Sequence, residues 1–240
     1  MTGVVNIPGR LFRHIVELSE EFSETLSLTP NNGRLYTSVL SMDRVSYLYA
    51  EITDVEGDLF NIDIDITKKL KKFVSAINKK SDKTLTIAYD GDKYTFTYDN
   101  YFKFSVPRVA EDYLTKSEIK DINANYKFPV LLSKEDKSLL KTIVQNYKHI
   151  DFLYDKTGLI VRGVDEDSID TMSMVLSTEN EYDTSLRVRI NSRYLELVTK
   201  WSDVFTVCLD QSDYPIKFVL DSIDGLNAYV IVAPCIVQDY

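Results

Sequence analysis

The 240-residue sequence predicts an α+β fold in which amphipathic helices pack on antiparallel sheets. Three observations predict it. Four stretches carry apolar residues at spacings of three and four, the segments between them alternate apolar and polar residues, and the order of these elements repeats in the two halves. A hydrophobic content of 44%, with 12% aromatic residues, is enough to bury a sizeable core.

The four helices are expected at residues 10–22, 67–80, 133–149 and 191–203. Leu11, Phe12 and Ile15 lie on one face of the first helix. Ser133 and Asn191 are side chains that favour the N-cap, and each comes directly before a periodic apolar run. Each helix has a single apolar face, so each should lie on a sheet rather than cross the core.

Strand signals fill the segments between the helices. Four segments have a period of two and form two hairpins: 85–89 with 94–98, and 205–209 with 216–220. Asp90-Gly91-Asp92 provides the turn of the first hairpin. A further strand from Ala228 to Ala233 is apolar nearly throughout.

The two halves of the chain indicate a duplicated module of about 110 residues. Residues 33–48 can be laid over residues 158–172 when one residue is dropped, which places Gly33 on Gly158. We therefore expect an N-terminal domain over 1–109, a connector over 110–126 and a C-terminal domain over 127–240. The connector is charged and lacks clear periodicity.

Composition excludes several classes of protein. No apolar run approaches the roughly 18 residues of a membrane helix, and the start of the chain does not read as a signal peptide. The only cysteines, Cys208 and Cys235, are too few for a disulfide framework or a thiolate metal site. We expect an intracellular protein without cofactor or metal, which would be cytoplasmic if it is archaeal or viral in an archaeal host and nuclear if it is eukaryotic.

Enzyme motifs are also missing from the sequence. It contains neither a phosphate-binding P-loop nor a dinucleotide-binding glycine fingerprint. His14 and His149 fall on separate predicted helices without an arranged nucleophile. Asp63 and Asp65 alternate on a strand and could hold a metal, but a solvated strand face is the favoured interpretation. The sequence therefore predicts a protein that is not an enzyme.

Charge is distributed unevenly along the chain, which has 28 basic and 37 acidic residues and a net charge of -9. The four predicted helices hold 14 basic and 7 acidic residues, and the rest of the chain holds 14 and 30. Lysines decorate the solvent face of many amphipathic helices, so one basic helix would mean little. Four helices of opposite sign to the remaining chain favour a positive surface that holds a polyanion loosely.

Four further motifs are spread over the chain: Asn191–Lys200 (NSRYLELVTK), Ser212–Leu220 (SDYPIKFVL), Tyr229–Ile236 (YVIVAPCI) and Leu40–Leu48 (LSMDRVSYL). They resemble motifs of the DNA sliding clamps, the proliferating-cell-nuclear-antigen (PCNA) family, with an archaeal or viral type of composition. Each motif alone is weak, but their order and spacing extend over essentially the whole chain. The chain is therefore identified as similar to a DNA sliding clamp.

This resemblance implies a two-domain protomer, three of which close into a ring around duplex DNA as a polymerase processivity factor. Basic residues on the helices would contact DNA: Arg13, His14, Lys68, Lys69, Lys72, Lys141, Lys148, Arg193 and Lys200. Glu20 stands where the family has a lysine, which weakens the first helix as a DNA contact. Ring closure would pair edge strands near Tyr101–Val106 and Thr171–Leu176.

The resemblance also implies a site for short peptides that carry a glutamine and an aromatic plug. Through these peptides a clamp binds DNA polymerase, flap endonuclease and DNA ligase in replication and repair, and a clamp loader opens the ring. The matching positions are Met42, Arg44, Val45, Leu114, Tyr126, Pro215, Ile231, Ala233 and Pro234. Met42, Val45 and Ile231 could equally be plain sheet core.

Two alternatives to a homotrimeric ring remain open. One is a subunit of a heterotrimeric or checkpoint-type clamp. The other is a clamp-like scaffold that binds partners without encircling DNA, which the weak charge of the first helix would favour.

Overall fold

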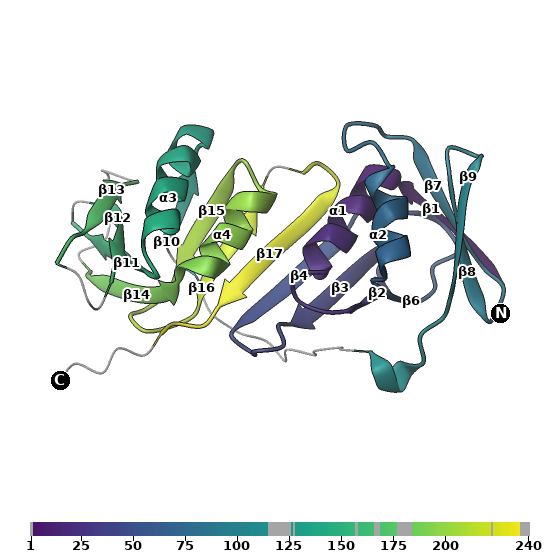
Figure 1. The fold of residues 1–240 in the computed structure, drawn as a ribbon, viewed down its shortest axis with the longest axis horizontal. Helices are drawn as coiled ribbons and strands as arrows, with labels where there is room; N and C mark the ends of the chain where they lie inside the picture. Colours follow the sequence, from purple (N-terminus) through teal and green to yellow (C-terminus); the bar gives the residue numbers. More distant parts are fainter. Residues whose placement is uncertain are drawn as a thin grey trace. The chain divides into compact units, whose positions relative to one another are not determined.

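The protein is described by a computed structural model, which covers residues 2–114, 126, 128–156, 158–165, 169–176, 184–221 and 223–235 (Figure 1). The chain forms two compact units. Unit 1 comprises residues 1–120 and 224–228, and unit 2 comprises residues 121–223 and 229–240. Among the described residues, no helix has the length and apolar character needed to cross a membrane. The expected domain bounds stay a prediction, and most of the expected connector, residues 115–125, lies outside the described residues.

The described part of unit 1 contains two α-helices, a 3₁₀ helix and two sets of antiparallel strands. Its elements are β1 (Gly3–Pro8), α1 (Gly9–Ser19), β2 (Thr25–Asn31), β3 (Arg34–Leu40), β4 (Ser46–Ile52), β5 (Glu56–Gly57), β6 (Ile62–Asp65), α2 (Lys68–Ser75), β7 (Thr84–Tyr89), β8 (Lys93–Tyr98), β9 (Phe102–Pro107) and the 3₁₀ helix η1 (Glu111–Tyr113). One sheet has the order β5-β1-β7-β8-β9, and the other strands follow the order β4-β3-β2-β6.

Unit 2 has the same plan. Its elements are β10 (Phe128–Leu132), α3 (Lys134–Asn146), β11 (His149–Asp155), β12 (Gly158–Val164), β13 (Met172–Val175), β14 (Leu186–Asn191), α4 (Ser192–Trp201), β15 (Phe205–Leu209) and β16 (Ile216–Leu220). The strand β17 (Leu226–Val232) begins in unit 1 and ends in unit 2. The strand orders are β13-β12-β11-β14 and β10-β15-β16.

The two units repeat each other pair by pair, which confirms the predicted α+β class and the repeated order of elements. The pairs β1–β7 and β2–β6 of unit 1 correspond to β10–β15 and β11–β14 of unit 2, all antiparallel. The predicted hairpins are present as β7–β8 and β15–β16. One detail of the repeat was wrong by a residue. Asn31 pairs with Arg34 and Asp155 pairs with Gly158, so hairpin geometry places Arg34, not Gly33, on Gly158.

All four helices are shorter than their apolar periodicity predicts. α2 ends at Ser75, although the pattern continues to the buried Ile77 in the irregular segment that follows. The helix starts agree better with the sequence because side-chain caps fix those of α2, α3 and α4. Ser133 forms a capping box with Asp136, and the Asn191 side chain accepts a hydrogen bond from the Arg193 amide.

Aromatic side chains join helices to sheets in the core of each unit. In unit 1, Phe12 of α1 lies 5.2 Å from Phe96 of β8, measured between ring centroids. In unit 2, Phe152 of β11 lies 5.9 Å from Phe218 of β16, so the core holds its two sheets together. The two helices of each unit lie side by side, α1 with α2 and α3 with α4 (Figure 1). The polar helix faces are thereby left to solvent.

Candidate nucleic-acid interface and partner-peptide site

On α1, Arg13 holds the two helices of unit 1 together. Its guanidinium donates to Glu17 at 2.8 Å, to the carbonyl of Ser75, the last residue of α2, at 2.8 Å, and to the carbonyl of Ile77 at 2.6 Å. These carbonyls have no partner within the helix, so Arg13 satisfies them. The predicted phosphate contact would therefore have to share a guanidinium that already has three partners.

His14, the next predicted DNA contact, is held uncharged. Burial and the nearby Lys79 lower the pKa of its imidazole to about 4. Its Nδ1 atom is buried without a hydrogen-bond partner among the described residues. At neutral pH His14 thus adds no positive charge to α1.

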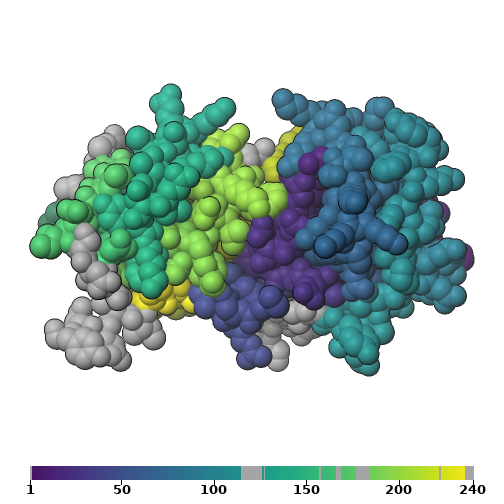
Figure 2. All heavy atoms as spheres, viewed as in Figure 1, coloured from purple at the N-terminus to yellow at the C-terminus, as the bar shows by residue number. Residues whose placement is uncertain are grey.

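α2 presents the densest set of cations in unit 1. Thr67 caps the helix, and its hydroxyl accepts a hydrogen bond from the Leu70 amide. Lys68, Lys69 and Lys72 are exposed and have no ion pair among the described residues. Figure 2 views unit 1 onto its helices, with α1 in purple beside α2 in blue. These three ammonium groups can approach a phosphate backbone without breaking an internal contact.

Glu17 of α1 and Glu20, which directly follows the helix, neutralise two other lysines of this region, which sequence reasoning missed. Lys71 pairs with Glu20 at 2.9 Å, and Lys79 pairs with Glu17 at 2.8 Å. A spacing of three or four along one helix could reveal a pair such as Arg13 and Glu17. Pairs between two helices depend on tertiary packing, so no sequence signal could have found them.

In unit 2 the predicted DNA contacts fall into two kinds. Lys141 of α3 and Lys148 of the following turn are exposed, with no ion pair among the described residues. Arg193 and Lys200 of α4 lie on aromatic rings, 4.6 Å above the centroid of Tyr194 and 4.9 Å above that of Trp201. A cation on a ring keeps its charge while its position is restrained.

The predicted partner-peptide residues of unit 1 lie in the turn between β3 and β4 and after η1. Ser41 and Asp43 hold the turn through a hydrogen bond of 2.5 Å, and Arg44 has a φ of 58°. Met42 is 83% exposed, which removes it from the sheet core. Val45 and Leu114 are half-buried. The flexible thioether side chain of an exposed methionine can adapt to partners of different shape.

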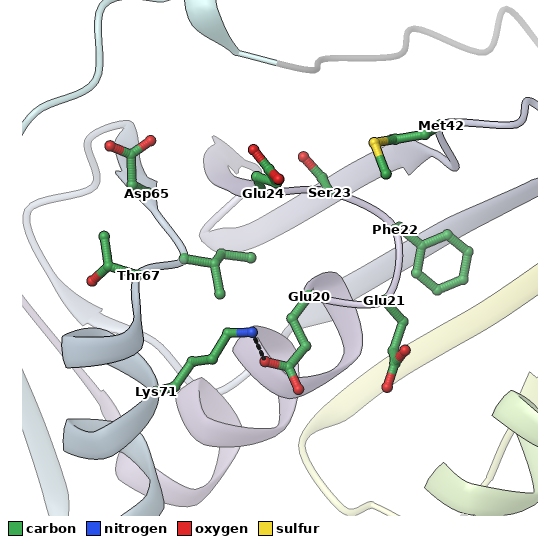
Figure 3. Close-up of a pocket in the computed structure, with 10 residues that line it drawn as sticks. Glu20, Glu21, Phe22, Ser23, Glu24, Met42, Asp65, Thr67 and Lys71 are labelled. Atoms are coloured by element: carbon green, nitrogen blue, oxygen red, sulfur yellow. Dashed lines mark ion pairs between the residues drawn. The ribbon is translucent and has the colours of Figure 1, made fainter.

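Met42 also lines a pocket of about 560 Å³ in unit 1, drawn in Figure 3. Four carboxylates, a single ammonium group and several uncharged groups line this pocket: Glu20, Glu21, Phe22, Ser23, Glu24, Met42, Asp65, Ile66, Thr67 and Lys71. The ammonium of Lys71 is taken up by Glu20. The lining of this pocket is acidic, so the pocket itself does not suit a phosphate backbone.

One predicted residue of unit 2, Tyr126, lies beside a cation that also contacts Tyr229. The ammonium of Lys217 is 4.2 Å from the ring centroid of Tyr229 and 5.7 Å from that of Tyr126. Burial raises the pKa of the Tyr126 hydroxyl, which has no hydrogen-bond partner among the described residues. The remaining members differ in burial, with Pro215, Ala233 and Pro234 half-buried and Ile231 buried. That these residues form one groove with those of unit 1 stays a prediction.

The expected subunit edges are strand edges within their own units. β9 is the last strand in the order β5-β1-β7-β8-β9, and β13 begins the order β13-β12-β11-β14. Both expose apolar side chains, including Phe102 at 37% and Val175 at 55%. An uncovered strand edge with apolar side chains is able to pair with another strand.

Comparison with known proteins was made by sequence and by structure. No family model and no curated protein matches the sequence. The structure resembles PCNA from A. fulgidus bound to the C-terminal region of FEN-1, with a TM-score of 0.82, 14% identity and coverage of 99% of this chain and 100% of that one. It also resembles the PCNA2–PCNA3 complex of Sulfolobus tokodaii, with a TM-score of 0.77, 17% identity and coverage of 98% and 99%. PCNA of Entamoeba histolytica gives a TM-score of 0.79, 14% identity and the same coverage. The chain therefore has the fold of the PCNA-type sliding clamps.

Proposed function

We propose that this chain is a DNA sliding clamp, a non-enzymatic processivity factor that encircles duplex DNA and tethers replication and repair enzymes. The observation that carries this proposal is the clamp fold over 98–99% of the chain. A clamp acts through its closed ring shape. Structural similarity over nearly the whole chain therefore supports this function more than any single residue does.

The charge of the helices supports DNA as the occupant of the ring. The exposed lysines of α2 and α3 offer phosphate contacts with no sequence preference. Their number is small, and acidic residues compensate several neighbouring cations. Weak attraction is what a sliding ring requires, because topology rather than affinity keeps it on DNA.

Short peptides of partner enzymes are the second proposed ligand. The A. fulgidus clamp was solved with the C-terminal region of FEN-1, which supports a flap endonuclease as one partner of this chain. DNA polymerase and DNA ligase would use the same groove, with Met42 adapting to different aromatic plugs. A clamp loader would open the ring.

Self-assembly is tested first by light scattering from micromolar to sub-micromolar protein. A homotrimer, closed by pairing β9 with β13 of the next copy, has a mass near three times 27.6 kDa, or about 83 kDa.

Retention on DNA then tests encirclement. The ring should stay on a nicked circular plasmid in high salt and slide off the same plasmid once it is linearised. Equal loss from both plasmids would contradict encirclement.

A heteromeric ring is the second candidate, favoured by the PCNA2–PCNA3 complex among the similar structures. In that case the chain alone stays below the trimer mass at every concentration, and a ring forms only with a second clamp subunit. A monomer that binds partner peptides but never remains on circular DNA would instead support a scaffold that does not encircle DNA.

A further inference from the structure

Unit 2 carries one buried aspartate among three arginines. Asp151 of β11 is 0% exposed, and Arg189 donates to its two oxygens at 2.6 and 3.1 Å. Arg162 and Arg187 donate to the second oxygen at 3.1 and 3.2 Å. The carboxylate therefore accepts four hydrogen bonds, which uses its accepting capacity.

Strand pairing places this arginine cluster (Arg162, Arg187 and Arg189 around Asp151) on one face of the sheet. Asp151 lies directly opposite Arg162 on β12 and Arg189 on β14. Ile150 and Phe152, its chain neighbours, are fully buried in the core. Because side chains alternate along a strand, the arginine cluster faces away from the core.

The charges of the cluster do not cancel. Burial alone would raise the pKa of Asp151, but hydrogen bonds from Arg189 and Arg162 outweigh it and hold that pKa below its usual value. One carboxylate against three guanidinium groups leaves a surplus of two positive charges. Such a concentration of positive charge destabilises the folded protein unless solvent or an anion compensates it.

Two of the three arginines have donors to spare. The side chains of Arg162 and Arg187 are 37% and 41% exposed, and each gives Asp151 only one of its terminal nitrogens. The Nε atoms of both are buried without a hydrogen-bond partner among the described residues. The guanidinium plane is a fork that matches a carboxylate in a bidentate arrangement.

The arginine cluster adjoins the unit 2 part of the predicted partner-peptide site. The amide of Cys235 donates to the carbonyl of Arg189 at 2.7 Å, so the Ala233–Cys235 segment lies along β14. The amide of Asp213 donates to the carbonyl of Arg187 at 3.0 Å, which brings the segment before Pro215 to the same strand. A peptide held at Ala233, Pro234 and Pro215 would run beside the cluster.

We propose that Arg162 and Arg187 bind the carboxylate of an aspartate or glutamate in an acidic segment of a partner protein. This inference rests on the proposed function, because it places the acidic segment beside the docked peptide. DNA fits the cluster less well, because its predicted contacts lie on the helices and the arginines face away from the core on which α3 and α4 pack.

The test uses three labelled synthetic peptides and fluorescence anisotropy. One carries a glutamine and an aromatic plug, the second adds three glutamates to it, and the third is hexaglutamate alone. We expect the added glutamates to tighten binding about tenfold, and the variant Arg162→Gln/Arg187→Gln to abolish that gain while binding the first peptide normally. The control variant Lys68→Gln/Lys69→Gln loses the same charge and should keep the gain.

The outcomes separate this inference from the proposed function. If the first peptide binds and the glutamates add no affinity, or if both variants lose the gain equally, the inference is wrong and the proposed function stands. If only the glutamate-bearing peptides bind, through the arginines, the inference stands and the peptide-docking function fails. A larger loss of duplex DNA binding than of peptide binding in the arginine variant would also overturn the inference.

Two features keep a folding defect of the variant from being mistaken for a loss of binding. Arg189 keeps both of its hydrogen bonds to Asp151 when the other two arginines are replaced, so the buried carboxylate retains a partner. In wild-type protein labelled at arginine Nε, hexaglutamate should also shift two signals that the single variants Arg162→Gln and Arg187→Gln identify. Unshifted signals would contradict the proposal without any loss of fold.

Discussion

The matching sheets of the two units share a topology but differ in charge. Counted back from the hairpin, Ser27 of β2 occupies the place of Asp151 of β11, since each lies four residues before the end of its strand. In unit 1, Ser27 donates to Asp63 at 2.6 Å, and Arg108 lies 3.5 Å from the other oxygen of Asp63. One arginine faces one aspartate there, whereas unit 2 places three arginines on Asp151.

The difference shows that the duplicated backbone gives both units equivalent positions on their strands, whereas the side chains at these positions decide their role. The polar group of unit 1 is electrically balanced and serves to join β2, β6 and the segment after β9. The group of unit 2 has excess positive charge and spare donors, which makes it a candidate binding site. Equivalent strands thus support a structural contact in one unit and an interaction surface in the other.

The helix pairs differ as well. In unit 1, Glu17 forms ion pairs with Arg13 and Lys79, and Glu20 forms one with Lys71, so much of the basic charge is used inside the unit. In unit 2, Arg193 and Lys200 lie over aromatic rings. Both units retain exposed lysines, but unit 1 concentrates them on α2.

The largest effect should come from removing the carboxylate of unit 2. Asp151→Asn leaves three guanidinium groups without a counter-charge and should lower the free energy of unfolding by about 3–5 kcal/mol. The counterpart Ser27→Ala removes one hydrogen bond and should cost about 1 kcal/mol. Urea denaturation measures both, and equal losses would show that the two sheet faces do not differ as their charges indicate.

A second comparison concerns the neutral histidine of α1. His14 has an ordinary pKa of 6.5 in the unfolded chain and about 4 in the folded protein, so protons favour unfolding as the pH falls below 6.5. Stability should fall by up to about 2 kcal/mol between pH 7 and pH 5 from this group alone. Thermal or urea unfolding of His14→Gln should lack that part of the pH dependence, and an unchanged profile would contradict the assignment.

The smallest effect is expected at the proposed DNA interface. Charge reversal at Lys72 and Lys200 should reduce polymerase processivity about three- to tenfold, because each removes a phosphate attraction and adds a repulsion. Assembly, checked by light scattering, should be unchanged. Lys93→Glu is the control, since it reverses a charge on β8, away from the helices. A processivity equal to that of wild type in the double variant would refute the assignment of the helix faces.

The sequence by itself determined the class of fold, the duplicated order of elements and most helix starts. These depend on local rules: apolar periods of 3.6 and 2, and caps such as Ser133 and Asn191 whose side chains bind nearby amides. Helix ends were predicted too long because apolar periodicity continues where the backbone has already left the helix, as at Ile77. The motif resemblance named the clamp fold that the structural comparison shows.

Only the tertiary structure decided which charges remain available. Lys71 and Lys72 are neighbours in sequence, yet Lys71 pairs with Glu20 of another segment and Lys72 has no ion pair among the described residues. Arg162 and Arg187 lie 11 and 36 residues after Asp151 and meet it only through strand pairing. Coulomb attraction depends on distance in space, and a sequence pattern reports distance along the chain. The arginine cluster could therefore not be predicted from the sequence, although the sequence contains every residue in it.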